Sequence, residues 1–104
     1  MSHEQKDHVV ELNIQNSQDR ALRLYLEPWG EELSIPPTVT YKVEARGPEG
    51  DFLQIEVVEG GVAVWGWPGS IVSIFHNEKV VAECRVPVPG TPTRIEVVRK
   101  RQDQ

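Results

Sequence analysis

The feature that most limits how this chain can fold is an alternation of apolar and polar residues with a period of two, interrupted by Gly and Pro. In residues 22–27, Leu22, Leu24 and Leu26 occupy every second position. Leucine favours helices, but this spacing cannot place three leucines on one helix face, so the run predicts a strand. Similar runs predict about eight short strands, at residues 10–15, 22–27, 39–46, 53–58, 62–67, 70–76, 80–85 and 95–97, with a shorter extended piece at 33–35.

Turn residues separate these runs at intervals of about 8–12 residues. The stretches Gly47-Pro48-Glu49-Gly50 and Glu59-Gly60-Gly61 have the composition of turns, and Pro68-Gly69 suits a type II turn. No segment shows the period of 3.6 residues that is typical of a helix. The pattern predicts an all-β domain, either an antiparallel β-sandwich or a small barrel.

The stretch from Leu33 to Val43, in which Pro36-Pro37 precedes an alternating strand, resembles the lead-in to a strand in immunoglobulin-like and cupredoxin-like sandwiches. The resemblance covers about a tenth of the chain and implies one of these two sandwich architectures. It implies no function, because unrelated functions share such folds.

The apolar side of each run is expected to face the core. The predicted inward residues are Leu12, Ile14, Leu22, Leu24, Leu26, Val43, Leu53, Ile55, Val57, Ala82 and Ile95. Residues 62–67 are apolar on both sides and contain no charged residue. If they form an edge strand, they should pair with a second copy of the chain.

The length of 104 residues suits one domain, which we assign to residues 1–98. Residues 1–98 contain 8 Lys and Arg against 15 Asp and Glu, whereas residues 99–104 contain three cations and one anion. The acidic domain repels phosphate backbones, so a nucleic-acid partner is not expected. Residues 99–104 are interpreted as a solvated, basic polar tail that keeps the last strand soluble.

The single cysteine, Cys84, excludes an intrachain disulfide. Residues 1–7 are polar and lack the apolar segment of a signal peptide. No run approaches the roughly 18 apolar residues of a membrane span. We therefore expect a cytoplasmic protein without a membrane partner.

Residues that could perform catalysis or bind metal are sparse. A blue-copper site needs two His and a Cys, usually with a Met nearby, but neither His nor Met follows Cys84. Cys84 and His76 lie on strands predicted to be adjacent, and their proximity is better explained as a hairpin contact than as a nucleophile and its base. We predict no cofactor, no metal site and no catalytic site, with Cys84 as a small buried apolar residue.

The three tryptophans are the most informative candidates for a binding site, because each lies beside turn residues. Trp29 follows Pro28, and Trp65 and Trp67 flank Gly66. If residues 62–67 form a strand, Trp65 and Trp67 share a face. The rings either cap the open end of the core or form an exposed platform. Three carboxylates near Trp29 would give such a platform an acidic rim: Glu27, Glu31 and Glu32.

From these features we predict a non-catalytic interaction domain whose Trp-containing surface binds a protein partner, with a second copy of the chain as one such partner. An alternative is a carbohydrate-binding module that uses Trp29, Trp65 and Trp67. A further alternative is a small enzyme with an acid/base site at Glu27, Glu31 and Glu32. Exposed coplanar rings would favour sugar, an exposed mixed apolar patch would favour protein, and buried rings would leave only a structural role.

Overall fold

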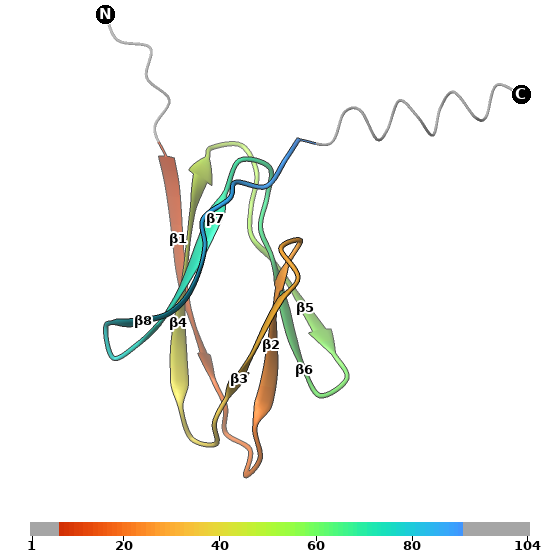
Figure 1. Ribbon diagram of the computed structural model, residues 1–104, viewed down its shortest axis with the longest axis vertical. Helices are drawn as coiled ribbons and strands as arrows, with labels where there is room; N and C mark the ends of the chain where they lie inside the picture. The colour runs from red at the N-terminus through yellow and green to blue at the C-terminus, as the bar shows by residue number, and fades with distance from the viewer. Residues whose placement is uncertain (1–6, 91–104) are drawn as a thin grey trace, which may run out of the picture.

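A computed structural model describes residues 7–90, which form eight strands in two four-stranded sheets (Figure 1). The all-β prediction is confirmed. The strands are β1 (Asp7–Gln15), β2 (Leu22–Glu27), β3 (Glu31–Ile35), β4 (Thr40–Pro48), β5 (Gln54–Val58), β6 (Gly61–Trp65), β7 (Ile71–His76) and β8 (Lys79–Cys84). The predicted strand at 95–97 and the basic tail at 99–104 lie outside the described residues. Within residues 7–90, no helix is long and apolar enough to cross a membrane.

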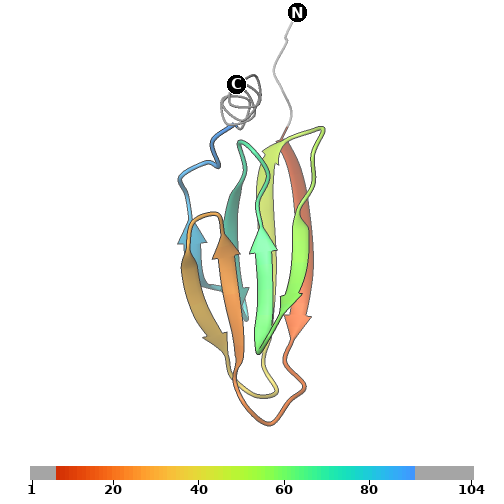
Figure 2. The same ribbon diagram turned by 90° about the vertical axis from the view of Figure 1, so that its right-hand side faces the viewer.

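The two sheets face each other, and the chain passes repeatedly between them (Figure 2). One sheet has the strand order β1-β4-β7-β8 and the other has the order β3-β2-β6-β5. Paired strands in residues 7–90 are antiparallel except for β2 and β6, which are parallel. The prediction of a wholly antiparallel sandwich is wrong at this central pair, because side chains alternate in the same way in both kinds of pairing.

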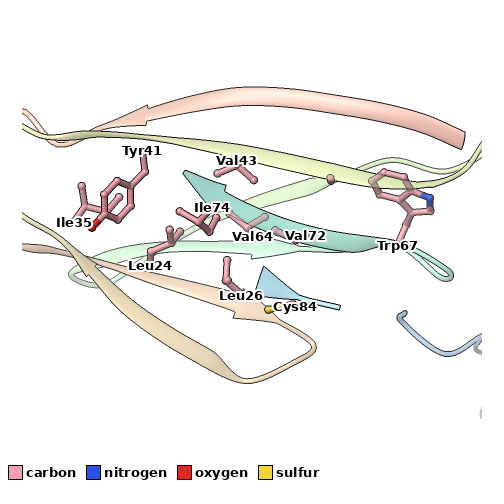
Figure 3. Packing of buried hydrophobic residues seen from close by; sticks show 11 residues of the cluster. Leu24, Leu26, Ile35, Tyr41, Val43, Val64, Trp67, Val72, Ile74 and Cys84 are labelled. Atoms are coloured by element: carbon pink, nitrogen blue, oxygen red, sulfur yellow. The ribbon is translucent and has the colours of Figure 1, made fainter. Parts of the chain in front are cut away.

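The core lies between the sheets and is built from the inward sides of their strands (Figure 3). Its fully buried side chains include Leu24 and Leu26 of β2, Val43 of β4, Val64 of β6 and Ile74 of β7. Burial therefore confirms the predictions for Leu24, Leu26 and Val43. Five other predicted inward residues are partly buried against this core: Leu12, Ile14, Leu22, Leu53 and Ala82.

Two residues of β5 that were predicted to lie in the core are exposed: Ile55 is 43% exposed and Val57 is 83% exposed. Ile55 pairs with Val64 and Val57 pairs with Val62, so the alternation identifies the correct face of the sheet. The burial prediction is wrong for the structure of residues 7–90, because β5 is an edge strand and no other described segment covers its end of the sheet. The remaining predicted inward residue, Ile95, lies outside the described residues.

The edge strand of the other sheet, β1, lies on the same side of the sandwich as β5 (Figure 2). We call this open side, between the edges of β1 and β5, the β1–β5 seam. Opposite it, the edges of β3 and β8 form the other side of the sandwich.

Two further expectations about the strands are corrected. Gly47 and Pro48 were predicted to lie in a turn, but they continue β4. The backbone of Gly47 approaches Ser70, the residue before β7, so closely that a Cβ built on Gly47 would lie 2.7 Å from the Cα of Ser70. The strand in residues 62–67 is β6, which lies between β2 and β5. Both of its edges are paired, so it offers no edge to a second copy.

Asn16 connects the loops at the end of the sandwich where β1 ends and β4 begins. Its side-chain Nδ2 donates to the carbonyl oxygens of Arg20 (2.8 Å), Ile35 (2.9 Å) and Pro36 (3.2 Å). Its Oδ1 accepts from the backbone N–H of Gln18 at 2.9 Å. The residue is 1% exposed, so these bonds replace the water that its side-chain amide would otherwise bind.

Candidate functional site

Trp67 is a structural residue that closes the end of the core farthest from Asn16, where β4 ends. It is 2% exposed, and its Nε1–H donates to the carbonyl oxygen of Pro48 at 2.8 Å. Its backbone N–H donates to the Oγ of Ser70 at 2.9 Å, and the ring of His8 lies 6.1 Å away between centroids. Because both the ring and its polar atom are already occupied, Trp67 presents no surface to a ligand.

Trp29 is partly buried and joins three segments. Its Nε1–H donates to the carbonyl oxygen of Val86 at 2.6 Å, beyond the end of β8. Its ring packs against Gly66, where an added Cβ would lie 2.7 Å from Cη2 of Trp29. Trp29 thus fixes the segment after β8 and the loop after β6 to the β2–β3 turn, in contact with the residue that separates Trp65 from Trp67.

Trp65 is the tryptophan that remains available to a partner. It is the last residue of β6 and is 38% exposed. Its Nε1–H donates to Oε1 of Glu56 at 3.0 Å. It lines a cleft of about 260 Å³, which we call the Trp65 cleft. The other lining residues are Pro28, Gly66, Pro68, Val88, Pro89 and Gly90.

The expectation that Trp65 and Trp67 share one face is wrong. The strand ends at Trp65, and Gly66 and Trp67 lie between it and the turn at Pro68-Gly69, so the alternation does not extend to Trp67. Trp65 pairs opposite Gln54 and Glu27 on the outer face of its sheet, whereas Trp67 packs into the core. The structure therefore places Trp29 against Gly66, next to the partly exposed ring of Trp65, and forms no platform of three tryptophans.

The three glutamates near Trp29 are separated by the fold. Glu27 pairs opposite Trp65 at the end of β2. Glu32 forms an ion pair with Arg23 farther along the outer face. Glu31 lies on the other side of β3, where its charge acts on Cys84. Of the three, only Glu27 pairs directly with Trp65, and the second carboxylate at Trp65 belongs to Glu56.

The lining residues Pro68, Val88 and Pro89, and the carboxylate of Glu56, were missed by the sequence reasoning. The sequence predicts a connection without regular pairing over residues 87–92, and the described part, residues 87–90, forms no strand. The prediction does not indicate what this connection covers. The segment is held by the Nε1–H of Trp29, which donates to Val86, and by two backbone hydrogen bonds that join Val88 to Gly69 and Ser70. The Pro-rich composition of the segment indicates neither contact. Glu56 could be placed next to Trp65 only once the β5–β6 register was known.

Cys84 and His76 do not form a nucleophile–base pair. They lie at opposite ends of the β7–β8 pairing, with His76 opposite Lys79 and Cys84 opposite Val72. The predicted burial of Cys84 is confirmed. Burial raises the pKa of its thiol to about 11, and the negative charge of Glu31 adds to the rise.

Cys84 is therefore expected to react slowly with iodoacetamide. Raising the pKa from 9.0 to about 11 lowers the thiolate fraction at pH 8 roughly a hundredfold, and the thiolate is the reactive form. Mass spectrometry should show alkylation at least about fiftyfold slower in the native chain than in urea. The protonated thiol also stabilises the fold up to about pH 9, and this contribution is lost as the pH rises toward 11. Equal alkylation rates in native and unfolded chains would contradict the prediction.

Comparisons with protein-family models, with curated proteins and with solved structures find no match to this chain. Among residues 7–90, no three His, Cys, Asp or Glu side chains gather as a metal site requires. Function is therefore inferred from the geometry of the Trp65 cleft.

Proposed function

We propose that this chain is a non-catalytic interaction domain that presents the Trp65 cleft to a protein partner. The observation that carries the proposal is an exposed tryptophan in a cleft whose other walls are mainly proline, valine and glycine. Tryptophan is enriched among the residues that dominate binding energy, because it buries a large apolar area with little loss of side-chain freedom. Walls that contain three prolines are rigid, so little order has to be gained on binding.

The charges next to the cleft indicate the chemistry of the partner segment. Glu56 accepts the Nε1–H of Trp65, and Glu27 pairs opposite Trp65 on the neighbouring strand. Residues 47–75 contain no Lys or Arg, so no cation in this stretch neutralises Glu56. A partner segment that places an apolar side chain in the cleft and a Lys or Arg beside these carboxylates would be complementary to it.

The alternatives have less support from the geometry. A sugar-binding platform requires several exposed rings in one plane, but Trp67 is buried and the Nε1–H of Trp29 is bonded within the chain. An acid/base site at Glu27, Glu31 and Glu32 requires three carboxylates that converge, but Glu31 lies on the opposite side of the sheet from the other two.

The proposal is tested by selecting peptides from a random phage-displayed library on the wild-type chain and measuring their affinities by fluorescence titration. We expect selected peptides to combine an aromatic or aliphatic residue with Lys or Arg, and Trp65→Ala to weaken their binding at least about tenfold. The matched control is Phe52→Ala, which removes an exposed aromatic ring outside the Trp65 cleft.

Three outcomes would overturn the proposal. One is a library that yields no binder, and another is binding that Trp65→Ala and Phe52→Ala weaken equally. The third is Trp65-dependent binding to immobilised glycans in place of peptides, which would favour the carbohydrate-binding alternative.

A further inference from the structure

The β1–β5 seam has an apolar surface that the described residues leave uncovered. Ile55 and Val57 point to the core side of β5, yet Val57 is almost fully exposed. Across the seam, Leu12 and Ile14 of β1 are only partly buried against the core. The outer edge of β5 also carries backbone N–H and C=O groups that β6 does not pair with. An uncovered edge with apolar side chains is the kind of site that folded proteins usually cover with another segment.

The charges along the seam limit what can cover it. Neither β1 nor β5 contains a Lys or Arg, whereas they carry Asp7, Glu11 and Glu56. The loops at the two ends of β5 add Asp51 and Glu59. A second copy that approached with its own β5 would bring the same negative charge to the interface. The seam therefore suits a strand with alternating apolar residues and positive charge.

We propose that residues 94–101 of the same chain cover the β1–β5 seam by pairing with the outer edge of β5. Their sequence is Arg-Ile-Glu-Val-Val-Arg-Lys-Arg, which contains four of the 11 cations of the chain. Ile95 and Val97 alternate with Arg94 and Glu96, so one side of the segment is apolar. If Ile95 pairs opposite Ile55, Val97 lies beside Val57, and the cations of the segment lie beside the acidic edge of β5.

Gly90, the last described residue, lies at the end of the sandwich where β5 begins. Gly90 lines the Trp65 cleft, and Trp65 pairs opposite Gln54, the first residue of β5. Paired strands are about 4.8 Å apart, and the step from residue 90 to residue 94 spans up to about 13 Å when extended. The segment would therefore arrive at the Gln54 end of β5 and run parallel to it, as β2 runs parallel to β6 in the same sheet.

Hydrogen exchange of the full-length chain, followed by mass spectrometry at low micromolar concentration, tests the pairing. The matched variants are Val97→Asp and Val98→Asp, which introduce the same charge at neighbouring positions on opposite sides of the segment. We expect Val97→Asp to speed exchange in β5 peptides about tenfold and Val98→Asp to leave it within about twofold of wild type. Exchange in β2, inside the same sheet, reports global stability and should not change in either variant.

Equal β5 exchange in the wild type and Val97→Asp would overturn the proposal, as would equal acceleration by both variants. Sedimentation at the same concentrations shows whether the chain is a dimer, in which a second copy could cover the seam. If β5 is protected only where the chain is dimeric, a second copy covers the seam and the intrachain pairing is wrong. None of these outcomes depends on the Trp65 cleft, so the two proposals stand or fall separately.

Discussion

Replacing Trp67 by alanine is expected to lower the free energy of unfolding by about 3–5 kcal/mol, a large part of the 5–15 kcal/mol typical of a whole domain. The substitution leaves a cavity at the end of the core and removes the donor that satisfies the carbonyl oxygen of Pro48. Urea unfolding followed by far-UV circular dichroism measures the loss without relying on tryptophan fluorescence.

The matched control for this prediction is Trp65→Ala, because the two tryptophans are two residues apart and only Trp67 is buried. The control should cost about 1 kcal/mol. Trp67→Phe keeps most of the ring but removes the N–H, so it should cost an intermediate amount, about 1–3 kcal/mol. Equal losses for Trp67→Ala and Trp65→Ala would contradict the assignment of Trp67 to the core and Trp65 to the binding surface.

Asn16→Asp is expected to lower the free energy of unfolding by about 3–5 kcal/mol at pH 7, although the two side chains have nearly the same shape. The amide group donates to three loop carbonyls, and a carboxylate would place negative oxygens against them in a site that is 1% exposed. Urea unfolding at several pH values measures the effect. The loss should shrink as the pH falls, because protonation removes the buried charge and restores one donor.

Asn13→Asp is the control for this second prediction, since Asn13 is exposed on β1 and lies only three residues away. It should change stability by less than about 0.5 kcal/mol. A similar loss in both variants, or a loss for Asn16→Asp that does not depend on pH, would show that the hydrogen bonds of Asn16 do not hold the loops together.

The alternation of side chains was sufficient to predict the strands and the inward sides of most of them. It could not predict that Val57 is exposed. Alternation assigns a residue to a face of its own sheet, but it does not indicate whether another segment covers that face. It also could not predict the role of Asn16, which sits in a stretch that reads as an ordinary polar turn. The hydrogen bonds that bury Asn16 reach carbonyls about 20 residues away, and no local pattern reports them.

The candidate site was predictable to a smaller degree. The association of tryptophan with turns directed attention to the end of the sandwich where Trp29 packs against Gly66, beside Trp65. Which ring is exposed depends on where β6 ends, and the strand ends at Trp65, two residues before the buried Trp67. The prolines of the cleft come from three separate segments, so their convergence is a property of the topology.

The parallel pairing of β2 with β6 has a consequence for how the chain folds. The hairpins β2–β3 and β5–β6 are each local, but the two strands that join them are about 40 residues apart in the sequence. Neither hairpin alone can bury Leu24, Leu26 and Val64, because their shared core forms only when the hairpins meet. We therefore expect the closure of this long loop to limit the folding rate, with folding on the millisecond-to-second scale of domains dominated by distant contacts. Substitutions at the β2–β6 junction should then slow folding, whereas those in the β7–β8 hairpin should mainly speed unfolding.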